Sequence, residues 1–167
     1  LPRHKDDALF FANRGLEPIY APQRVVEVFA AVAAQWPQAR LVVANHGSLL
    51  GALQAQVRHL GLLDQVRFVG RLDAAAQSEH YARSRWYLSL PRSDSVSVSV
   101  LEAMAHGCVP LLSDLPANHE LVRSGDNGLI LADGATLSAT ALQPLRQGAG
   151  EIARANHEWV RQHAMFG

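Results

Sequence analysis

Cysteine is nearly missing from this 167-residue chain, in which Cys108 is the single example. One cysteine excludes an intramolecular disulfide and a zinc–thiolate cluster, and this usage suits a reducing compartment. An excess of positive charge is missing too, because 15 Lys and Arg residues balance 15 Asp and Glu residues. This balance argues against a general nucleic-acid binder, so we expect no nucleic-acid partner.

Long apolar runs are also missing from the chain. No stretch approaches the roughly 20 residues that cross a membrane, and the polar residues 1–7 lack the apolar core of a signal peptide. Hydrophobic residues make up 49% and charged residues 18%, which excludes general disorder. The length fits one globular domain. Because the first residue is Leu1 and not Met, we interpret the chain as a piece of a longer protein.

Short apolar runs alternate with longer amphipathic ones along the whole chain. The short runs predict strands at 8–12, 41–44, 66–69, 86–90, 109–112 and 128–131. The longer runs predict helices at 22–36, 49–60, 74–83 and 99–106, and a mostly helical end at 137–163 that is interrupted near Pro144 and at 148–150. Strands that alternate with helices predict an α/β fold, in which a parallel sheet of about six strands is the middle of three αβα layers.

Three side chains have predicted structural roles. Pro110 lacks a backbone N–H, so we expect the strand at 109–112 to be irregular or to lie at an edge of the sheet. His106 comes just before a helix-ending glycine, and we expect it to serve the C-terminus of that helix. Cys108 precedes an apolar stretch and is predicted to be buried and inert.

Ligands of parallel α/β sheets bind at the carboxyl ends of the strands, near the point where the strand order reverses. The candidate residues are therefore those that follow the predicted strands, at 13–15, 45–47, 70–72, 91–94 and 113–114. The most informative segment is 93–110, which follows a strand and opens a helix. The first turn of a helix presents N–H groups without partners and a partial positive charge, which suits a phosphate.

Two carboxylates mark this segment. Asp94 lies just before the predicted helix, and Glu102 lies inside it, where a carboxylate that faces the crevice accepts hydrogen bonds from a pair of sugar hydroxyls. Spacing alone leaves two other interpretations open. The Ser–Val alternation at 95–100 is also typical of a half-buried strand. A glutamate in a first helical turn commonly compensates the helix dipole.

Seven segments give the chain a family resemblance. They are 14–20 (RGLEPIY), 41–44 (LVVA), 60–70 (LGLLDQVRFVG), 101–110 (LEAMAHGCVP), 113–114, 120–122 and 125–130. In this order they resemble the C-terminal, donor-binding domain of family-four (group 1) glycosyltransferases, which have two Rossmann-like domains in the GT-B architecture. The resemblance implies that residues 1–167 form a single Rossmann-like domain that binds a nucleotide-sugar donor. It also implies that the N-terminal acceptor domain is absent from this chain.

The resemblance assigns roles to individual residues. It implies that Asp94, in place of the family's usual Glu, contacts donor-sugar hydroxyls, that Glu102 binds the ribose hydroxyls, and that Arg14 contacts the diphosphate. These three are the implied catalytic residues. The other implied donor-binding residues are Gly15, Gly70, Arg71, Leu72, Ser97, Val98 and Ser99. Of these, the backbone at 97–99 meets the sugar and diphosphate, and 70–72 lies where the family holds the base.

The sequence departs from the family's pattern in two places. A lysine is usual about six residues after the arginine, but Tyr20 or Ala21 stands there, so this contact is missing or is supplied by Arg24 or Arg71. A solvated cation at a strand end is the alternative interpretation of Arg71. The usual glycine-rich turn after the first acid is replaced by the serine-rich turn 95–97, which we interpret as the mark of a subgroup.

The resemblance implies a retaining enzyme that moves a sugar from a nucleotide-diphospho-sugar to an acceptor, in glycan or polysaccharide biosynthesis, with this chain alone inactive. We expect no metal and no cofactor, because the eight histidines are scattered along the chain. The implied partners are the nucleotide-sugar donor and the protein's own N-terminal acceptor-binding domain. The implied location is the cytoplasm, or the cytoplasmic face of the inner membrane through a lipid-linked acceptor.

Two alternatives remain: a non-catalytic nucleotide-sugar-binding or interaction module on the same fold, and a nucleotide-sugar epimerase of similar architecture.

Overall fold

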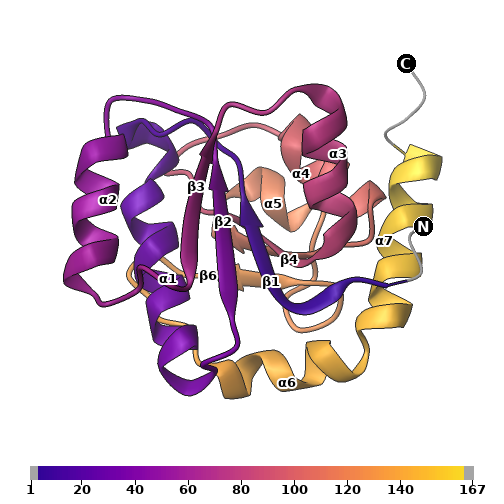
Figure 1. The fold of residues 1–167 in the computed structure, drawn as a ribbon. Helices are drawn as coiled ribbons and strands as arrows, with labels where there is room; N and C mark the ends of the chain where they lie inside the picture. The colour runs from indigo at the N-terminus through magenta and orange to yellow at the C-terminus, as the bar shows by residue number, and fades with distance from the viewer. Residues whose placement is uncertain (1–3, 164–167) are drawn as a thin grey trace.

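A parallel sheet of six strands lies at the centre of the computed structural model, which describes residues 4–163 (Figure 1). The strands are β1 (Asp6–Ala12), β2 (Arg40–Ala44), β3 (Val66–Gly70), β4 (Ser84–Ser89), β5 (Val109–Ser113) and β6 (Leu129–Leu131). Their order across the sheet is β3-β2-β1-β4-β5-β6, and every neighbouring pair is parallel. The predicted α/β fold is therefore confirmed.

Helices cover both faces of the sheet. They are α1 (Pro22–Gln35), α2 (Leu50–His59), α3 (Ala74–Arg83), α4 (Val98–Ala105), α5 (Pro116–His119), α6 (Ala139–Gln147) and α7 (Ala149–His163), with a short 3₁₀ turn η1 (Pro18–Tyr20). One core lies under α1, α2 and α6, and a second lies under α3, α4 and α7 (Figure 1). The three predicted αβα layers follow from these two cores.

Strand β1 shows why its sequence is an unbroken apolar run. Successive side chains of a strand point to opposite faces of the sheet. Phe10 and Ala12 therefore join the core under α1, whereas Leu9 and Phe11 join the core under α4. A parallel strand that is covered on both faces needs apolar residues at every position.

The segment after β4 is a loop that leads into a helix, so the strand interpretation of 95–100 is wrong. Ser97 is the N-cap of α4, and its Oγ accepts a hydrogen bond from the Val100 N–H at 3.3 Å. Ser97 and Val100 are buried, whereas Val96 and Val98 are exposed. Buried residues three positions apart are typical of a helix. The Ser97 cap stabilises the start of this helix, because it satisfies one of the N–H groups of the first turn.

Pro110 does not lie at an edge of the sheet, and that expectation is wrong. Strand β5 lies between β4 and β6, and Pro110 pairs with Tyr87 of β4. Pairing with β6 begins only at Leu111. The Pro110 carbonyl faces Gly128, where an added Cβ would lie 2.5 Å from its oxygen. The missing N–H is therefore tolerated, because it falls before the first paired residue on the β6 side.

The C-terminal part of the described chain is helical, with one difference from the prediction. Pro144 lies inside α6, and the break between α6 and α7 comes at Gly148. The sequence also did not predict the short helix α5.

His106 and Cys108 have the predicted structural roles. His106 is the C-cap of α4, and its Nδ1 lies 2.8 Å from the Glu102 carbonyl oxygen. Cys108 is fully buried, with its thiol directed at the Tyr81 and Ser84 carbonyls. Burial raises the pKa of the Cys108 thiol to about 11, although Lys5 Nζ lies 3.8 Å away and acts in the opposite direction.

Candidate functional site

The strand order reverses between β1 and β4, and the candidate site lies at the carboxyl ends of these two strands. The chain after β1 leads to α1 on one face of the sheet, and the chain after β4 leads to α4 on the other (Figure 1). Parallel α/β sheets bind their ligands in the crevice between two such connections. Residues 13–15 follow β1 and residues 90–94 follow β4, so they flank the expected crevice.

Arg14 and Asp94 meet across the crevice. Arg14 Nη1 donates to Asp94 Oδ2 at 2.9 Å and to Ser89 Oγ at 3.1 Å. The exposed fractions of the Arg14 and Asp94 side chains are 15% and 19%, so this ion pair is largely shielded from water. Burial is the largest single effect and lowers the pKa of Arg14, but the hydrogen bond with Asp94 and the nearby Asp94, Tyr87 and Tyr20 groups together outweigh it, so the pKa is raised. Two residues predicted for the donor site are thus brought together.

Tyr20 occupies the place where a lysine was expected. Its ring lies against the Arg14 guanidinium, with 4.6 Å between Arg14 Cζ and the ring centroid, which is a cation–π contact. An added Cβ at Gly15 would lie 3.2 Å from this ring. Gly15 therefore allows the close approach, and Tyr20 orients Arg14 in place of adding a second positive charge.

Glu102 is an exposed residue of α4 that lies beyond the first turn of this helix, and that turn has no acidic residue. The interpretation of Glu102 as a first-turn glutamate that compensates the helix dipole is therefore wrong. The first N–H groups of a helix have no acceptor within the helix, and those of α4 lie at the end of the loop that carries Asp94. The loop after β4 thus connects the Arg14–Asp94 pair to the N-terminus of α4, and Glu102 follows within the helix.

A buried polar network behind the crevice was missed by the sequence analysis. Tyr87 Oη donates to Asn13 Oδ1, Asn13 Nδ2 donates to Tyr81 Oη at 2.7 Å, and Tyr81 Oη donates to the Ser99 carbonyl at 3.1 Å. Burial raises the pKa of Tyr81 to about 12, so its hydroxyl stays protonated as the donor to Ser99. The network joins the end of β1 to the first turn of α4. The only signal in the sequence was an asparagine directly after an apolar strand.

Arg71 lies at the carboxyl end of the sheet beyond β3, beside His46. Its Nη2 is 2.6 Å from His46 Nε2, so this ring nitrogen accepts the hydrogen bond. Gly70 has a φ of +72°, which glycine adopts easily, and its carbonyl accepts from the Asn45 N–H at 2.7 Å. Leu72 is half-buried against the core under α4. Of the three residues predicted to hold the base, Gly70 therefore ends β3, Arg71 and Leu72 follow it, and the Arg71 guanidinium contacts His46.

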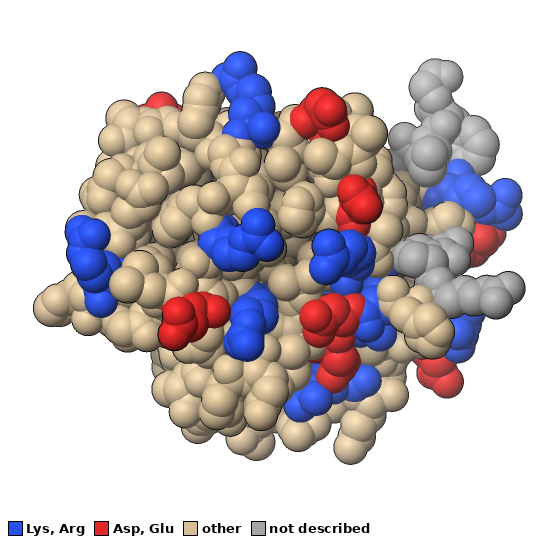
Figure 2. Space-filling model, viewed as in Figure 1, with Lys and Arg blue, Asp and Glu red and all other residues tan. Residues whose placement is uncertain are grey.

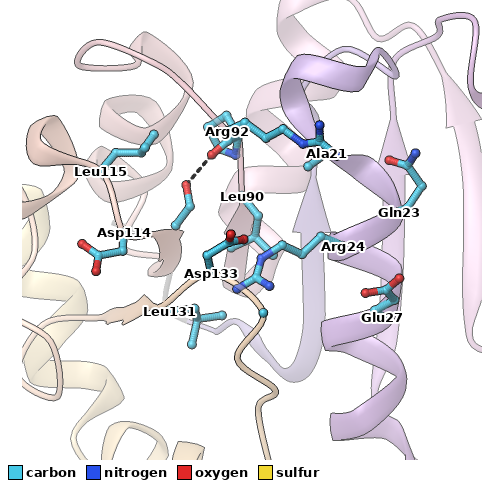
Figure 3. A pocket seen from close by; sticks show the side chains of 13 residues that line it. Ala21, Gln23, Arg24, Glu27, Leu90, Arg92, Asp114, Leu115, Leu131 and Asp133 are labelled. Atoms are coloured by element: carbon cyan, nitrogen blue, oxygen red, sulfur yellow. Dashed lines mark hydrogen bonds between the residues drawn. The ribbon is translucent and has the colours of Figure 1, made fainter.

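Arg24 lines a separate pocket, which Figure 3 shows. The pocket has a volume of about 860 Å³ and lies between α1 and the ends of β4, β5 and β6. Arg24 Nη2 donates to the Ala132 carbonyl at 2.6 Å. The two arginines that were candidates for the missing lysine contact thus differ in position, because Arg24 lies beside β6 and Arg71 beside β2.

Charge is mixed over the surface. On the face that Figure 2 shows, positive and negative side chains are interspersed without a field of one sign. Within residues 4–163, no three His, Cys, Asp or Glu side chains are grouped so as to hold a metal ion. No helix in the described part of the chain is long and apolar enough to cross a membrane.

A doubly wound parallel sheet with a polar crevice at its switch point defines the class of α/β domains that bind ligands at this edge. The profile of the family "Glycosyl transferases group 1" matches residues 1–147. The chain therefore belongs to this family.

Named relatives agree with this assignment. A phosphatidyl-myo-inositol mannosyltransferase of Mycobacterium tuberculosis is 28% identical over 145 residues, which cover 84% of this chain and 37% of that protein. The C-terminal domain of a group 1 glycosyl transferase (LpcC) from Francisella tularensis has a TM-score of 0.77 at 18% identity, covering 95% of this chain and 87% of that one. Anabaena HepE in complex with UDP-glucose also has a TM-score of 0.77 at 18% identity, covering 93% of this chain and 44% of that one. The chain thus spans little more than a third of the mannosyltransferase's length.

Proposed function

We propose that the chain is the donor-binding domain of a retaining glycosyltransferase, which moves a sugar from a nucleotide-diphospho-sugar to an acceptor in glycan or polysaccharide biosynthesis. The observation that carries the proposal is the Arg14–Asp94 pair at the switch point of the sheet, on the loop that leads into α4 and Glu102. Membership of the group 1 family supports the reaction class. The acceptor belongs to a separate N-terminal domain of the whole protein, and the chain alone does not catalyse transfer.

Arg14 and the N-terminus of α4 hold the diphosphate. Both described hydrogen bonds of Arg14 use Nη1, and we assign its remaining donors on Nη2 and Nε to phosphate oxygens. This positive potential stabilises the departing diphosphate while the sugar acquires oxocarbenium character. Backbone N–H groups at 97–99 face the same phosphates and the sugar.

The two carboxylates orient the donor. Asp94 has oxygen lone pairs beyond the one that accepts from Arg14, and we assign them to sugar hydroxyls. Glu102 is exposed and accepts hydrogen bonds from the two ribose hydroxyls. The base lies over Gly70, Arg71 and Leu72 at the end of β3. No step of the proposed reaction uses a metal ion or another cofactor.

The partners follow from the reaction. The donor is a nucleotide-sugar, which is the class of ligand in the HepE complex. The mycobacterial relative is named for a phosphatidyl-inositol acceptor, and we propose a lipid-linked acceptor that brings the whole protein to the cytoplasmic face of the inner membrane. The protein's own N-terminal domain closes the crevice and receives the acceptor.

A calorimetric screen of the chain against UDP, GDP, ADP and their sugars tests the donor site. We expect binding of one nucleotide series, and the preferred base identifies the donor. A chain that binds none of these nucleotides would exclude the proposal.

One observation favours a second function, a non-catalytic nucleotide-sugar-binding module. Tyr20 packs on Arg14 where the family usually has a lysine, so the crevice has one fewer cation for the diphosphate. An assay of sugar transfer by the whole protein separates the two functions, because only the enzyme yields a glycosylated acceptor.

A further inference from the structure

The pocket between α1 and the ends of β4, β5 and β6 is distinct from the proposed donor site. Arg14, Asp94 and Glu102 are not among the residues that line it. Its volume of about 860 Å³ falls in the range of small-molecule sites, which is about 300–1,000 Å³. It opens at the same edge of the sheet, where doubly wound folds bind their ligands.

The floor of the pocket is apolar. Ala21, Leu90 and Leu131 line it and have exposed fractions of only 6%, 1% and 7%. Figure 3 shows Leu90 and Leu131 behind the charged side chains that reach in from either side. A small apolar floor of this kind suits the C–H face of a ring better than a long hydrocarbon chain.

The rim of the pocket carries both donors and acceptors. Arg24 and Arg92 provide N–H donors, and Glu27, Asp114 and Asp133 provide carboxylate acceptors (Figure 3). Three carboxylates against two guanidinium groups leave no positive excess, so the lining does not favour a phosphate. Hydroxyl groups both donate and accept, and they match such a rim.

We propose that the acceptor, while held by the N-terminal domain, extends one neutral, polyhydroxylated sugar residue into this pocket, an inference that rests on the proposed glycosyl transfer. The loop after β4 is the wall that the pocket shares with the donor site. Pro91 and Arg92 line the pocket, and Asp94, two residues further on, pairs with Arg14. The Arg92 N–H donates to the Ile19 carbonyl at 2.9 Å, which holds this wall against the chain after β1. A sugar in the pocket therefore lies beside the loop that orients the donor sugar.

The test is an NMR titration of the 167-residue chain with three neutral disaccharides, maltose, cellobiose and mannobiose, and separately with UDP and GDP. We expect at least one disaccharide to shift the amide signals of the pocket residues. Glu27→Gln and Asp133→Asn, both at exposed positions, each remove an acceptor for hydroxyl groups and weaken that binding about fivefold or more. Both variants keep the nucleotide affinity of the unmodified chain. Asp64→Asn, exposed at the opposite edge of the sheet, is the matched control and leaves both affinities unchanged.

Three results would overturn the inference: no shift with any of the disaccharides, shifts centred on Arg14 and Glu102, or displacement of the sugar by inorganic phosphate. The nucleotide titration keeps this inference apart from the proposed function. Nucleotide binding without disaccharide binding contradicts only the acceptor pocket. Disaccharide binding without nucleotide binding contradicts the donor site.

Discussion

Arg14 and Asp94 are 80 positions apart in the sequence, and their side chains meet at 2.9 Å. Because most of each side chain is shielded from water, the two charges interact more strongly than an exposed pair. Glu102, in contrast, is exposed and has its carboxylate free for a ligand. At the scale of residues, the candidate site therefore has a preorganised Arg14–Asp94 ion pair and one exposed carboxylate, Glu102. We expect Asp94 and Glu102 to respond differently to substitution.

Glu102→Gln tests the ribose contact. A carboxylate that accepts from two ribose hydroxyls forms charge-assisted hydrogen bonds, each worth about 1.5–3 kcal/mol. We therefore expect nucleotide binding to weaken roughly tenfold or more in calorimetry, with an unchanged melting temperature. Glu151→Gln, at an exposed position in the first turn of α7, is the control. Unchanged affinity for every nucleotide that the unmodified chain binds would show that Glu102 does not contact the ribose.

Asp94→Asn separates the sugar from the nucleotide. The amide oxygen still accepts from Arg14 Nη1, so Arg14 keeps its position, but the charge that orients the sugar hydroxyls is lost. We expect weaker binding of the nucleotide-sugar and nearly unchanged binding of the bare nucleoside diphosphate, measured side by side by calorimetry. Asp126→Asn, at an exposed turn, is the control. Equal losses for both ligands would mean that Asp94 only supports Arg14.

Cys108 is expected to resist thiol reagents in the folded chain. Its pKa of about 11 is two units above the ordinary value of 9.0, so the reactive thiolate is about 100-fold scarcer at mildly alkaline pH. Labelling with a disulfide reagent, followed by absorbance, should be at least this much slower in the native chain than in guanidinium chloride. Equally fast labelling in both conditions would contradict the burial of the thiol.

Helix α4 is the element on which the site depends. Its N-terminus is fixed twice, by the Ser97 cap and by the hydrogen bond from Tyr81 to the Ser99 carbonyl. The second contact continues through Asn13 at the end of β1, so the two sides of the crevice are held by one buried network. Buried polar groups in such a network are costly to leave without a partner.

Tyr81→Phe tests whether this network positions α4. Loss of the hydroxyl leaves the Ser99 carbonyl and Asn13 Nδ2 without this partner, which costs about 1–3 kcal/mol of unfolding free energy. We expect faster amide exchange in the first turn of α4 and weaker nucleotide binding, read by hydrogen exchange and calorimetry. Tyr87→Phe removes the bond to Asn13 Oδ1, leaves the bond from Tyr81 to the Ser99 carbonyl in place, and is the comparison. If both variants lose stability but keep the affinity for nucleotide, the network is structural only.

At the scale of the whole molecule, the proposed function makes this chain one wall of a reaction site. Its crevice, its pocket and the N-terminus of α4 all lie at the carboxyl edge of the sheet. A second domain that covers this edge would exclude water and hold the acceptor. Orientation of two reactants in that way accounts for about 7–11 kcal/mol of barrier lowering.

The chain by itself is expected to bind a nucleotide and not to transfer a sugar. Arg14, Glu102 and the helix N-terminus still hold the ligand, with a Kd of about 10 μM to 1 mM, or roughly −7 to −4 kcal/mol. Calorimetry measures the binding, and chromatography of an incubation with nucleotide-sugar and acceptor measures transfer. Robust transfer by residues 1–167 would contradict the proposal that donor and acceptor bind to two different domains, because the whole acceptor site and the catalytic groups would then lie within this chain.

The sequence by itself determined the layers of this protein. Apolar periodicity is local, because it reflects how each short segment buries its own side chains, and it located the six strands and the main helices. The order of motifs, from the RGLEPIY segment at 14–20 to the segment at 125–130, also identified the family. Local pattern was insufficient where a neighbouring strand decides whether a residue is tolerated. Pro110 was expected to mark an irregular or edge strand, but it is tolerated inside the sheet because β6 begins to pair only at Leu111.

The tertiary structure alone decided which side chains meet. The sequence nominated Arg14 and Asp94 for a common ligand, but not their direct ion pair, nor the Tyr20 ring against Arg14. Apart from the asparagine directly after β1, it gave no sign of the network from Asn13 through Tyr81 to Ser99, or of the pocket that Arg24 lines. These contacts join residues from segments that follow different strands. The reversal of strand order between β1 and β4 decides how close these segments lie to one another. Spacing along one segment contains no information about them, because the packing of the whole sheet brings the segments together.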